Sequence, residues 1–176
     1  LLTSQVETQY EMDNLDDIID ATDLVMIARG DLGIETGVEN LPLYQQMMIS
    51  KCRAKGKRVI MATQMMSSMK HSIRPTNAEV TDVANAVLSG CDAIMTSDET
   101  TMGKYPVECV ETMVKISKSI EGTVNYWKRF NRKNFRKIDS EDLEKNIAYT
   151  TCVTAQQVEA DAIVAYTHKG DSVRLI

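Results

Sequence analysis

Acidic and polar side chains follow a series of apolar, strand-like runs in this sequence. Glu7 follows the run 1–6, Asp31 lies just beyond the run 24–28, and Thr63 follows a third run. In parallel α/β proteins the working groups collect at the carboxyl ends of the strands. Glu7 and Asp31 could therefore converge on one cation, because Mg²⁺ commonly takes one or two carboxylates plus water and substrate oxygens. The alternative is that both are solvated surface acids.

Two glycines surround Asp31 in the segment Arg29-Gly30-Asp31-Leu32-Gly33. Glycines directly after a buried strand allow a sharp turn and expose backbone N–H groups. If a short helix starts there, its N-terminus would attract a carboxylate or a phosphate. The segment is not a GxGxxG dinucleotide loop, and the sequence contains no Walker motif. Thr63 either donates its hydroxyl to a bound anion or caps a helix.

The elements that must position these side chains are predicted from continuous apolar runs. Three of them, Leu24–Ala28, Arg58–Ala62 and Cys91–Met95, recur with regular spacing, and Leu1–Val6 is a further candidate strand. Continuous rather than alternating hydrophobicity indicates strands buried on both faces, as in parallel sheets. Four strand-then-helix units in a row predict an α/β barrel or a doubly wound sheet.

Helical patterns separate the predicted strands. They begin or end at residues typical of helix termini: Asn14 before 15–20, Lys55-Gly56 after 43–49, Pro75 before 78–88 with Ser89-Gly90 behind it, and Pro106 before 107–120. Glycine adopts the left-handed conformation that ends many helices, and proline is favourable at the first helical position.

The composition changes after Gly122. Six of the ten residues in Lys128–Lys137 are basic, which favours a solvated linker over a nucleic-acid patch. Asp139 and Ser140 then precede a helical pattern over 143–158, and Ala162–Tyr166 is a predicted strand. We expect a first domain over 1–122, a basic linker over 123–138 and the beginning of a second α/β domain over 139–176.

The composition is that of an ordinary globular protein. The 176 residues carry a net charge of −5, with 43% apolar and 26% charged residues. These values exclude a disordered tail, a collagen-like fibre and a basic nucleic-acid module. No apolar run approaches the roughly 18 residues of a membrane span, and no signal-peptide pattern begins the chain. We therefore expect no nucleic-acid partner and no membrane contact.

The sulfur and imidazole side chains have simpler interpretations. Cys52, Cys91, Cys109 and Cys152 form no CxxC pair and no zinc-like cluster. We expect them to be buried free thiols of a cytoplasmic protein. The methionines at 61, 65, 66 and 69 are predicted to be packing residues, and His71 and His168 are predicted to lie at the surface.

Four ordered motifs resemble the pyruvate kinase family. Met26–Gly33 is similar to the family's metal and substrate loop, and Ala62–Met69 resembles its ATQM signature. Arg74–Val87 matches the RPTRAE…DVANAV helix almost residue for residue, and Gly103-Lys104-Tyr105-Pro106 follows a variant of the SGET loop.

The resemblance implies the second half of a (β/α)8 TIM barrel, followed by a truncated C-terminal α/β domain that begins near Asp139. It implies phosphoryl transfer from phosphoenolpyruvate to ADP, which gives ATP and enolpyruvate that is protonated to pyruvate in glycolysis. By the same resemblance Glu7 and Asp31 would hold Mg²⁺ or Mn²⁺. The amides of Gly30 and Asp31 and the hydroxyl of Thr63 would bind the substrate carboxylate. Thr63 would lie near the carbon that is protonated.

Other site residues also follow from the resemblance. Arg29 would fix its loop or an inter-subunit contact, and we expect a homo-oligomer. The family lysine of the Lys-Ile-Glu strand corresponds to Gln5 in Gln5-Val6-Glu7, and the Gly of SGET corresponds to Asp98. Losing a transition-state donor lowers rates by roughly 10²–10³. The first barrel half, with its phosphate-binding arginine, K⁺ ligands and lid domain, has no counterpart in these residues.

Three functions are compatible with these observations. The leading hypothesis is a partial pyruvate kinase that is inactive in this form. The second is a non-catalytic paralogue that serves as an interaction or regulatory subunit, which Gln5 and Asp98 favour. The third is another Mg²⁺-dependent barrel enzyme, such as an aldolase or lyase, which the helix 74–87 disfavours. Because a barrel takes about 250 residues, we expect two copies to pair through their sheet edges, or the half-barrel to open into a different sheet.

Overall fold

The computed structural model describes residues 1–127 and 142–176. These residues form two compact units, Leu1–Val124 and Asn125–Ile176. The predicted basic stretch Lys128–Lys137, together with Asp139 and Ser140, lies outside the described residues. Each unit is described by itself below.

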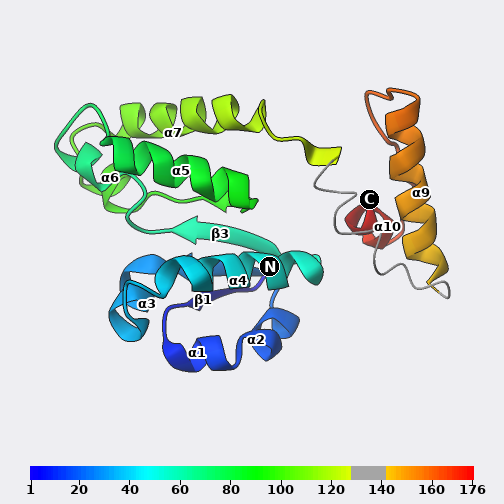
Figure 1. Ribbon diagram of the computed structural model, residues 1–176, viewed down its shortest axis with the longest axis horizontal. Coiled ribbons are helices and arrows are strands. Elements are labelled where there is room, and N and C mark those ends of the chain that lie inside the picture. The colour runs from blue at the N-terminus through cyan, green and yellow to red at the C-terminus, as the bar shows by residue number, and fades with distance from the viewer. Residues whose placement is uncertain (128–141) are drawn as a thin grey trace. The chain divides into compact units, whose positions relative to one another are not determined.

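The first unit alternates strands with helices (Figure 1). In chain order its elements are β1 (Thr3–Val6), α1 (Gln9–Asp13), α2 (Leu15–Ala21), β2 (Leu24–Ala28), α3 (Arg29–Thr36), α4 (Leu41–Ala54), β3 (Arg58–Ala62), the 3₁₀ helix η1 (Ser67–Lys70), α5 (Asn77–Ser89), β4 (Ala93–Ile94), α6 (Asp98–Thr101) and α7 (Pro106–Glu121). In Figure 1, α5 and α7 lie side by side, and α4 packs against β2 and β3.

The four strands form one parallel sheet in the order β1-β2-β3-β4. The predicted strands Leu24–Ala28 and Arg58–Ala62 are confirmed with the same bounds. The prediction of a strand over Cys91–Met95 was too long, because β4 covers only Ala93–Ile94. Its backbone still follows β3, since Asp92 N–H donates to Val59 and Met95 N–H to Met61, each over 2.9 Å.

The two faces of the sheet differ in exposure. Val6, Ile27 and Met61 are in register on one face and are buried in the hydrophobic core. The next register row, one residue earlier, contains Gln5, Met26, Ile60 and Ala93, all of them half-buried or exposed. Since alternate strand residues point to opposite faces, the helices cover one face and leave this row on the other, as in one half of a barrel.

Helix α5 has well-defined ends. The side chain of Thr76 accepts a hydrogen bond from Glu79 N–H, and Glu79 accepts one in return from Thr76 N–H, which forms a capping box. At the other end Gly90 has a φ of +85° and donates to Ala86 and Val87, as the sequence predicts. Pro75 therefore precedes the cap and does not open the helix itself.

The prediction that Asn14 caps the helix beginning at Leu15 is confirmed in position but not in side-chain bonding. Asn14 stands before α2, but its side chain makes no capping bond to that helix. Its Nδ2 instead donates to the carbonyl of Tyr10 over 2.8 Å. The reason is α1, a short helix that the sequence analysis missed, whose end Asn14 also forms.

The second unit contains α9 (Leu143–Gln157), which packs against α10 (Asp171–Leu175). The side chain of Asp142 caps α9 by accepting from Lys145 N–H over 3.0 Å. The predicted strand Ala162–Tyr166 was wrong: the segment is irregular, and Val164 and Tyr166 are 82% and 98% exposed. The described part of this unit offers no neighbouring strand with which the segment's backbone can pair.

The predictions for the sulfur-containing and histidine side chains are largely confirmed. Cys52, Cys109 and Cys152 are buried and Cys91 is half-buried, all as free thiols. Burial raises the pKa of Cys52 and of Cys91 to about 11. The methionines at 61, 65, 66 and 69 are buried, and both histidines are exposed. No helix among the described residues is long and apolar enough to cross a membrane.

Glu79 ties α5 to η1 and generates a pH-dependent prediction. Burial acts to raise its pKa, but four hydrogen bonds from Ser68 and Thr76 outweigh it and hold the pKa below the ordinary value of 4.5. The charged form therefore stabilises the fold above about pH 4.5, and this contribution is lost as the pH falls through the lower folded-state pKa. Glu79→Gln should lower the free energy of unfolding by about 1 kcal/mol at pH 7.

Urea denaturation at pH 7 and pH 4 measures this effect. The gap between wild type and Glu79→Gln should narrow at pH 4. The control is Glu111→Gln, which removes an exposed carboxylate 3.8 Å from Lys115 and should change stability little. A gap of equal size at both pH values would contradict the assignment.

Candidate active site

The loops after β2 and β3 meet through Gly30 and Thr63. The N–H of Gly30 donates to Oγ1 of Thr63 over 3.0 Å, across 33 positions of sequence. Thr63 and Gln64 have φ angles of +64° and +55°. Residues other than glycine adopt this left-handed backbone conformation only at an energetic cost. Thr63 does not precede a helix as its N-cap residue, but its hydroxyl accepts from an N–H in the first turn of α3 and so caps that helix from another loop. The turn brings its hydroxyl to the start of α3.

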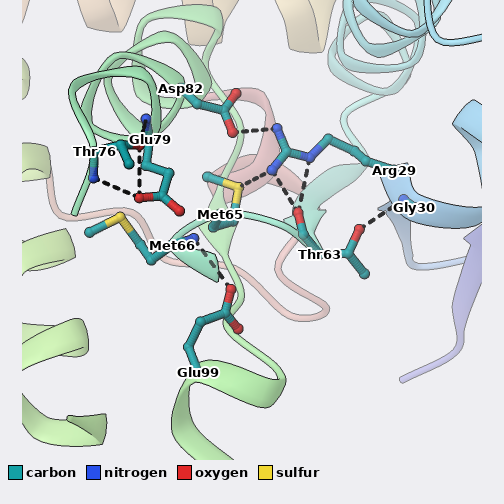
Figure 2. Close-up of polar contacts among 9 residues, drawn as sticks. All are labelled: Arg29, Gly30, Thr63, Met65, Met66, Thr76, Glu79, Asp82 and Glu99. Carbon is teal, nitrogen blue, oxygen red and sulfur yellow. Dashed lines mark hydrogen bonds and ion pairs between the residues drawn. The ribbon is translucent and has the colours of Figure 1, made fainter. Parts of the chain in front are cut away.

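Arg29 holds this turn in place (Figure 2). Its Nε and one terminal nitrogen donate to the carbonyl of Thr63 over 3.1 and 2.6 Å, and that terminal nitrogen also lies 2.9 Å from the sulfur of Met65. The other terminal nitrogen contacts Asp82 on α5 at 2.5 Å. The arginine is only 6% exposed. One buried guanidinium thus connects the exits of β2 and β3 to α5, which agrees with the expectation that Arg29 fixes its loop.

Glu99 connects the loop after β4 to the segment after β3. The residue is 2% exposed, and its carboxylate accepts from the backbone N–H groups of Met66 and Ser97 over 3.3 and 2.9 Å. Gly103 packs so closely on this segment that an added Cβ would lie 2.2 Å from the carbonyl oxygen of Glu99. The loop after β4 is therefore bound tightly to the segment after β3.

Gln5 and Glu7 lie together at the end of β1. The Nε2 of Gln5 donates to Oε2 of Glu7 over 2.5 Å. The backbone N–H of Glu7 and that of Thr8 both donate to Glu11, in the capping box of α1. Glu7 is half-buried. The bonds to Glu11 restrain its main chain, and the bond from Gln5 restrains its carboxylate.

Asp31 lies in the first turn of α3 and is exposed. It follows β2, whose residue Ile27 is in register with Val6, the residue before Glu7. Both carboxylates therefore follow neighbouring strands at the same edge of the sheet. The acidic residue also suits the positive end of the α3 dipole.

The donor set fits a divalent cation that keeps open positions. In the described part of the chain, no group of three or more His, Cys, Asp and Glu side chains is placed to hold a metal. Glu7 and Asp31 would instead offer carboxylate oxygens from two loops. Mg²⁺ accepts such a set because it retains water and binds substrate oxygens in its remaining positions.

The extra charge of Asp98 is compensated. Lys70, in the last turn of η1, contacts the Asp98 carboxylate at 2.5 Å, and the carbonyl of Lys70 accepts from Lys104 N–H over 2.9 Å. The expectation that Asp98 adds a negative charge beside the site is thus modified, because a cation pairs with it. The sequence contained no local signal for this pair or for Arg29–Asp82, since both connect residues far apart in the chain.

Parallel strands, helical crossovers and polar side chains at the strand exits define a protein of the β/α-barrel class. Comparison with known proteins agrees. The family model for the pyruvate kinase barrel domain matches residues 1–110. The chain belongs to the pyruvate kinase family, a family of phosphotransferases, and carries part of its barrel.

Individual relatives support the assignment along nearly the whole chain. A pyruvate kinase from Clostridium acetobutylicum is 45% identical over 174 residues, which cover 98% of this chain and 36% of the relative. One from Bacillus licheniformis is 44% identical, over 98% of this chain and 29% of the relative. The crystal structure of a pyruvate kinase from Cryptosporidium parvum matches with a TM-score of 0.92 and 38% identity, over 98% of this chain and 35% of that one. The chain thus spans about a third of the length of these relatives.

The strength of the Arg29 contacts generates a prediction. Arg29→Met leaves Asp82 and the Thr63 carbonyl without their donor inside the fold. Removing one member of a buried pair costs about 3–5 kcal/mol, and we expect the lower end because Asp82 is 36% exposed. Urea denaturation should show this loss, whereas Arg58→Met, which removes an exposed arginine from β3, should have little effect. Equal losses in the two variants would refute the role of Arg29.

Proposed function

We propose that this chain provides the carboxylate and hydroxyl side of a pyruvate kinase active site. In the proposed reaction the bond between phosphorus and the enol oxygen of phosphoenolpyruvate breaks. A new bond forms to the terminal oxygen of ADP, and a proton then adds to the enolpyruvate carbon to give pyruvate. The observation that carries the proposal is the junction of Gly30 and Thr63, which lies on motifs of the family and at the same ends of the strands that the two carboxylates follow.

Each site residue has a role in this proposal. Glu7 and Asp31 would hold Mg²⁺ or Mn²⁺, which when bound neutralises charge on the phosphoryl group and the enolate. The amides at the start of α3 and the hydroxyl of Thr63 would bind the substrate carboxylate, with Gly30 N–H exchanging its present partner, Thr63 Oγ1, for substrate. Thr63 would stay near the carbon that is protonated. We also propose that the parent enzyme uses K⁺ and acts in the cytoplasm in glycolysis; the four free thiols suit a reducing compartment.

We further propose that residues 1–176 alone do not turn over. Phosphoryl transfer depends on cations that face the transferred group. Of the cationic side chains described above, Arg29 is bound to Asp82 and Thr63, and Lys70 is bound to Asp98. Gln5, at the position of the family lysine, is neutral. The carboxylate side of the site is therefore present without these cations being available.

A second function is favoured by the same residues. Gln5 is hydrogen-bonded to Glu7, and Asp98 is paired with Lys70, so each of the two residues that depart from the family pattern has a partner within this chain. Such substitutions suit a pyruvate kinase-like paralogue that keeps the fold as an interaction or regulatory subunit. The two proposals differ in whether Glu7 and Asp31 bind a cation.

Mn²⁺ titration of the 176-residue chain separates the two proposals. We expect one bound ion, with Glu7→Gln and Asp31→Asn each weakening binding by more than about tenfold. The matched control is Asp13→Asn, which changes a carboxylate that is bonded to Gln9 in α1. Wild-type chain that binds no Mn²⁺ would reject the catalytic proposal and favour the paralogue.

Pyruvate release tests the catalytic role of the lysine position. Wild-type chain with phosphoenolpyruvate, ADP and Mg²⁺ should release no pyruvate above background. In a chain completed with the preceding part of the Clostridium acetobutylicum relative, Gln5→Lys should raise turnover by roughly 10²-fold or more. Turnover by the 176-residue species, with its mass verified, would contradict the inactivity. No gain from Gln5→Lys would contradict the role assigned to position 5.

We also propose that residues 1–176 taken alone form a homodimer. The outer edges of β1 and β4 carry backbone groups that no strand of the described sheet pairs, and such edges associate readily. Light scattering after size exclusion should give twice the 19.7 kDa mass of one chain, with the dimer fraction falling on dilution. A monomer at all concentrations would contradict pairing through these edges.

A further inference from the structure

A hydrogen bond at the end of β1 joins two residues with different tasks. Gln5 and Glu7 are two positions apart, so they point to the same side of the strand, while Val6 between them points into the core and is fully buried. The Gln5 amide donates to Glu7 Oε2 over 2.5 Å. This contact occupies one side of one carboxylate oxygen and leaves Oε1 to face other groups.

The backbone below this carboxylate is already fixed. Glu7 N–H and Thr8 N–H donate to the same oxygen of Glu11, over 2.7 and 2.9 Å. With the main chain held by α1, the remaining freedom of Glu7 lies in its side-chain rotamers. The Gln5 amide restricts those rotamers, and so removes part of the ordering cost that a bound cation would otherwise incur.

The amide differs from a charged donor in one respect. A lysine offers a positive charge that a phosphoryl group can use, but it also neutralises the carboxylate beside it. A neutral amide orients Glu7 and leaves its full negative charge for a cation. Groups that orient a ligating side chain in this way typically contribute 10–100-fold to metal affinity.

We propose that Gln5 is a positioning residue of the divalent-cation site, which orients the carboxylate of Glu7 without neutralising it. The inference rests on the proposed role of Glu7 as a ligand of Mg²⁺ or Mn²⁺. It gives the residue at position 5 a function in cation binding that is separate from phosphoryl transfer. The residue at position 5 then strengthens cation binding and contributes no charge to phosphoryl transfer.

The inference is tested by measuring Mn²⁺ binding to the 176-residue chain. The electron paramagnetic resonance signal of free Mn²⁺ reports how much of the ion is bound. Gln5→Met keeps length and neutrality and removes the amide with its donor, and should weaken Mn²⁺ binding about tenfold. Gln5→Asn, whose amide is too short to reach Glu7, should do the same and serves as a second variant. The matched control is Gln9→Met, which removes an amide that donates to Asp13 over 2.8 Å in α1; it should leave Mn²⁺ affinity unchanged. Far-UV circular dichroism verifies that each variant is folded.

The outcomes separate the inference from the proposal on which it rests. If folded Gln5→Met and Gln5→Asn bind Mn²⁺ as tightly as wild type while Glu7→Gln does not, the positioning role is overturned and the cation site stands. If Glu7→Gln binds as tightly as wild type, or wild type binds no Mn²⁺, the cation site itself is rejected and the inference with it. Weakening in both Gln5 variants but not in Gln9→Met supports it.

Discussion

The buried guanidinium of Arg29 is the constraint on which the rest of the site depends. It joins the exit of β2 to the Thr63 carbonyl after β3 and to Asp82 on α5. Its hydrogen bonds to the Thr63 carbonyl help to offset the cost of two successive left-handed residues, Thr63 and Gln64. The turn places the Thr63 hydroxyl within hydrogen-bond distance of Gly30 N–H. Arg29 binds the carbonyl of Thr63, and the hydroxyl of the same residue is the candidate substrate contact.

Charge at the same edge of the sheet is balanced locally. Arg29 pairs with Asp82 and Lys70 with Asp98, while Glu99 is satisfied by backbone N–H groups. Glu7 has a neutral partner in Gln5, and Asp31 is exposed. Of the carboxylates described at this edge, Glu7 and Asp31 are therefore the two for which the described contacts include neither a cation nor a backbone N–H donor. This distribution favours a cation at the site over an anion alone.

The features that could be predicted are those that depend on neighbouring residues in the sequence, such as the bounds of β2 and β3. The apolar runs of β2 and β3 set their bounds because both strands are buried between neighbours. The segment Ala162–Tyr166 has the same composition but no pairing strand in the described residues, so composition alone misled. Thr63 carries no sequence signal for a positive φ, since glycine is the usual residue there. Arg29–Asp82 is 53 positions apart, and only the fold brings its members together.

The central claim is that Glu7, Asp31 and Thr63 belong to one cation-dependent site at the ends of β1, β2 and β3. The most direct test is the paramagnetic broadening of backbone amide signals by substoichiometric Mn²⁺, measured by NMR on the 176-residue chain. The account predicts that the amides of Glu7, Gly30, Asp31 and Thr63 broaden first, while those of Gly56 and Lys57, at the opposite end of β3, remain sharp. Broadening that is centred elsewhere, or that persists unchanged in Glu7→Gln, would contradict it.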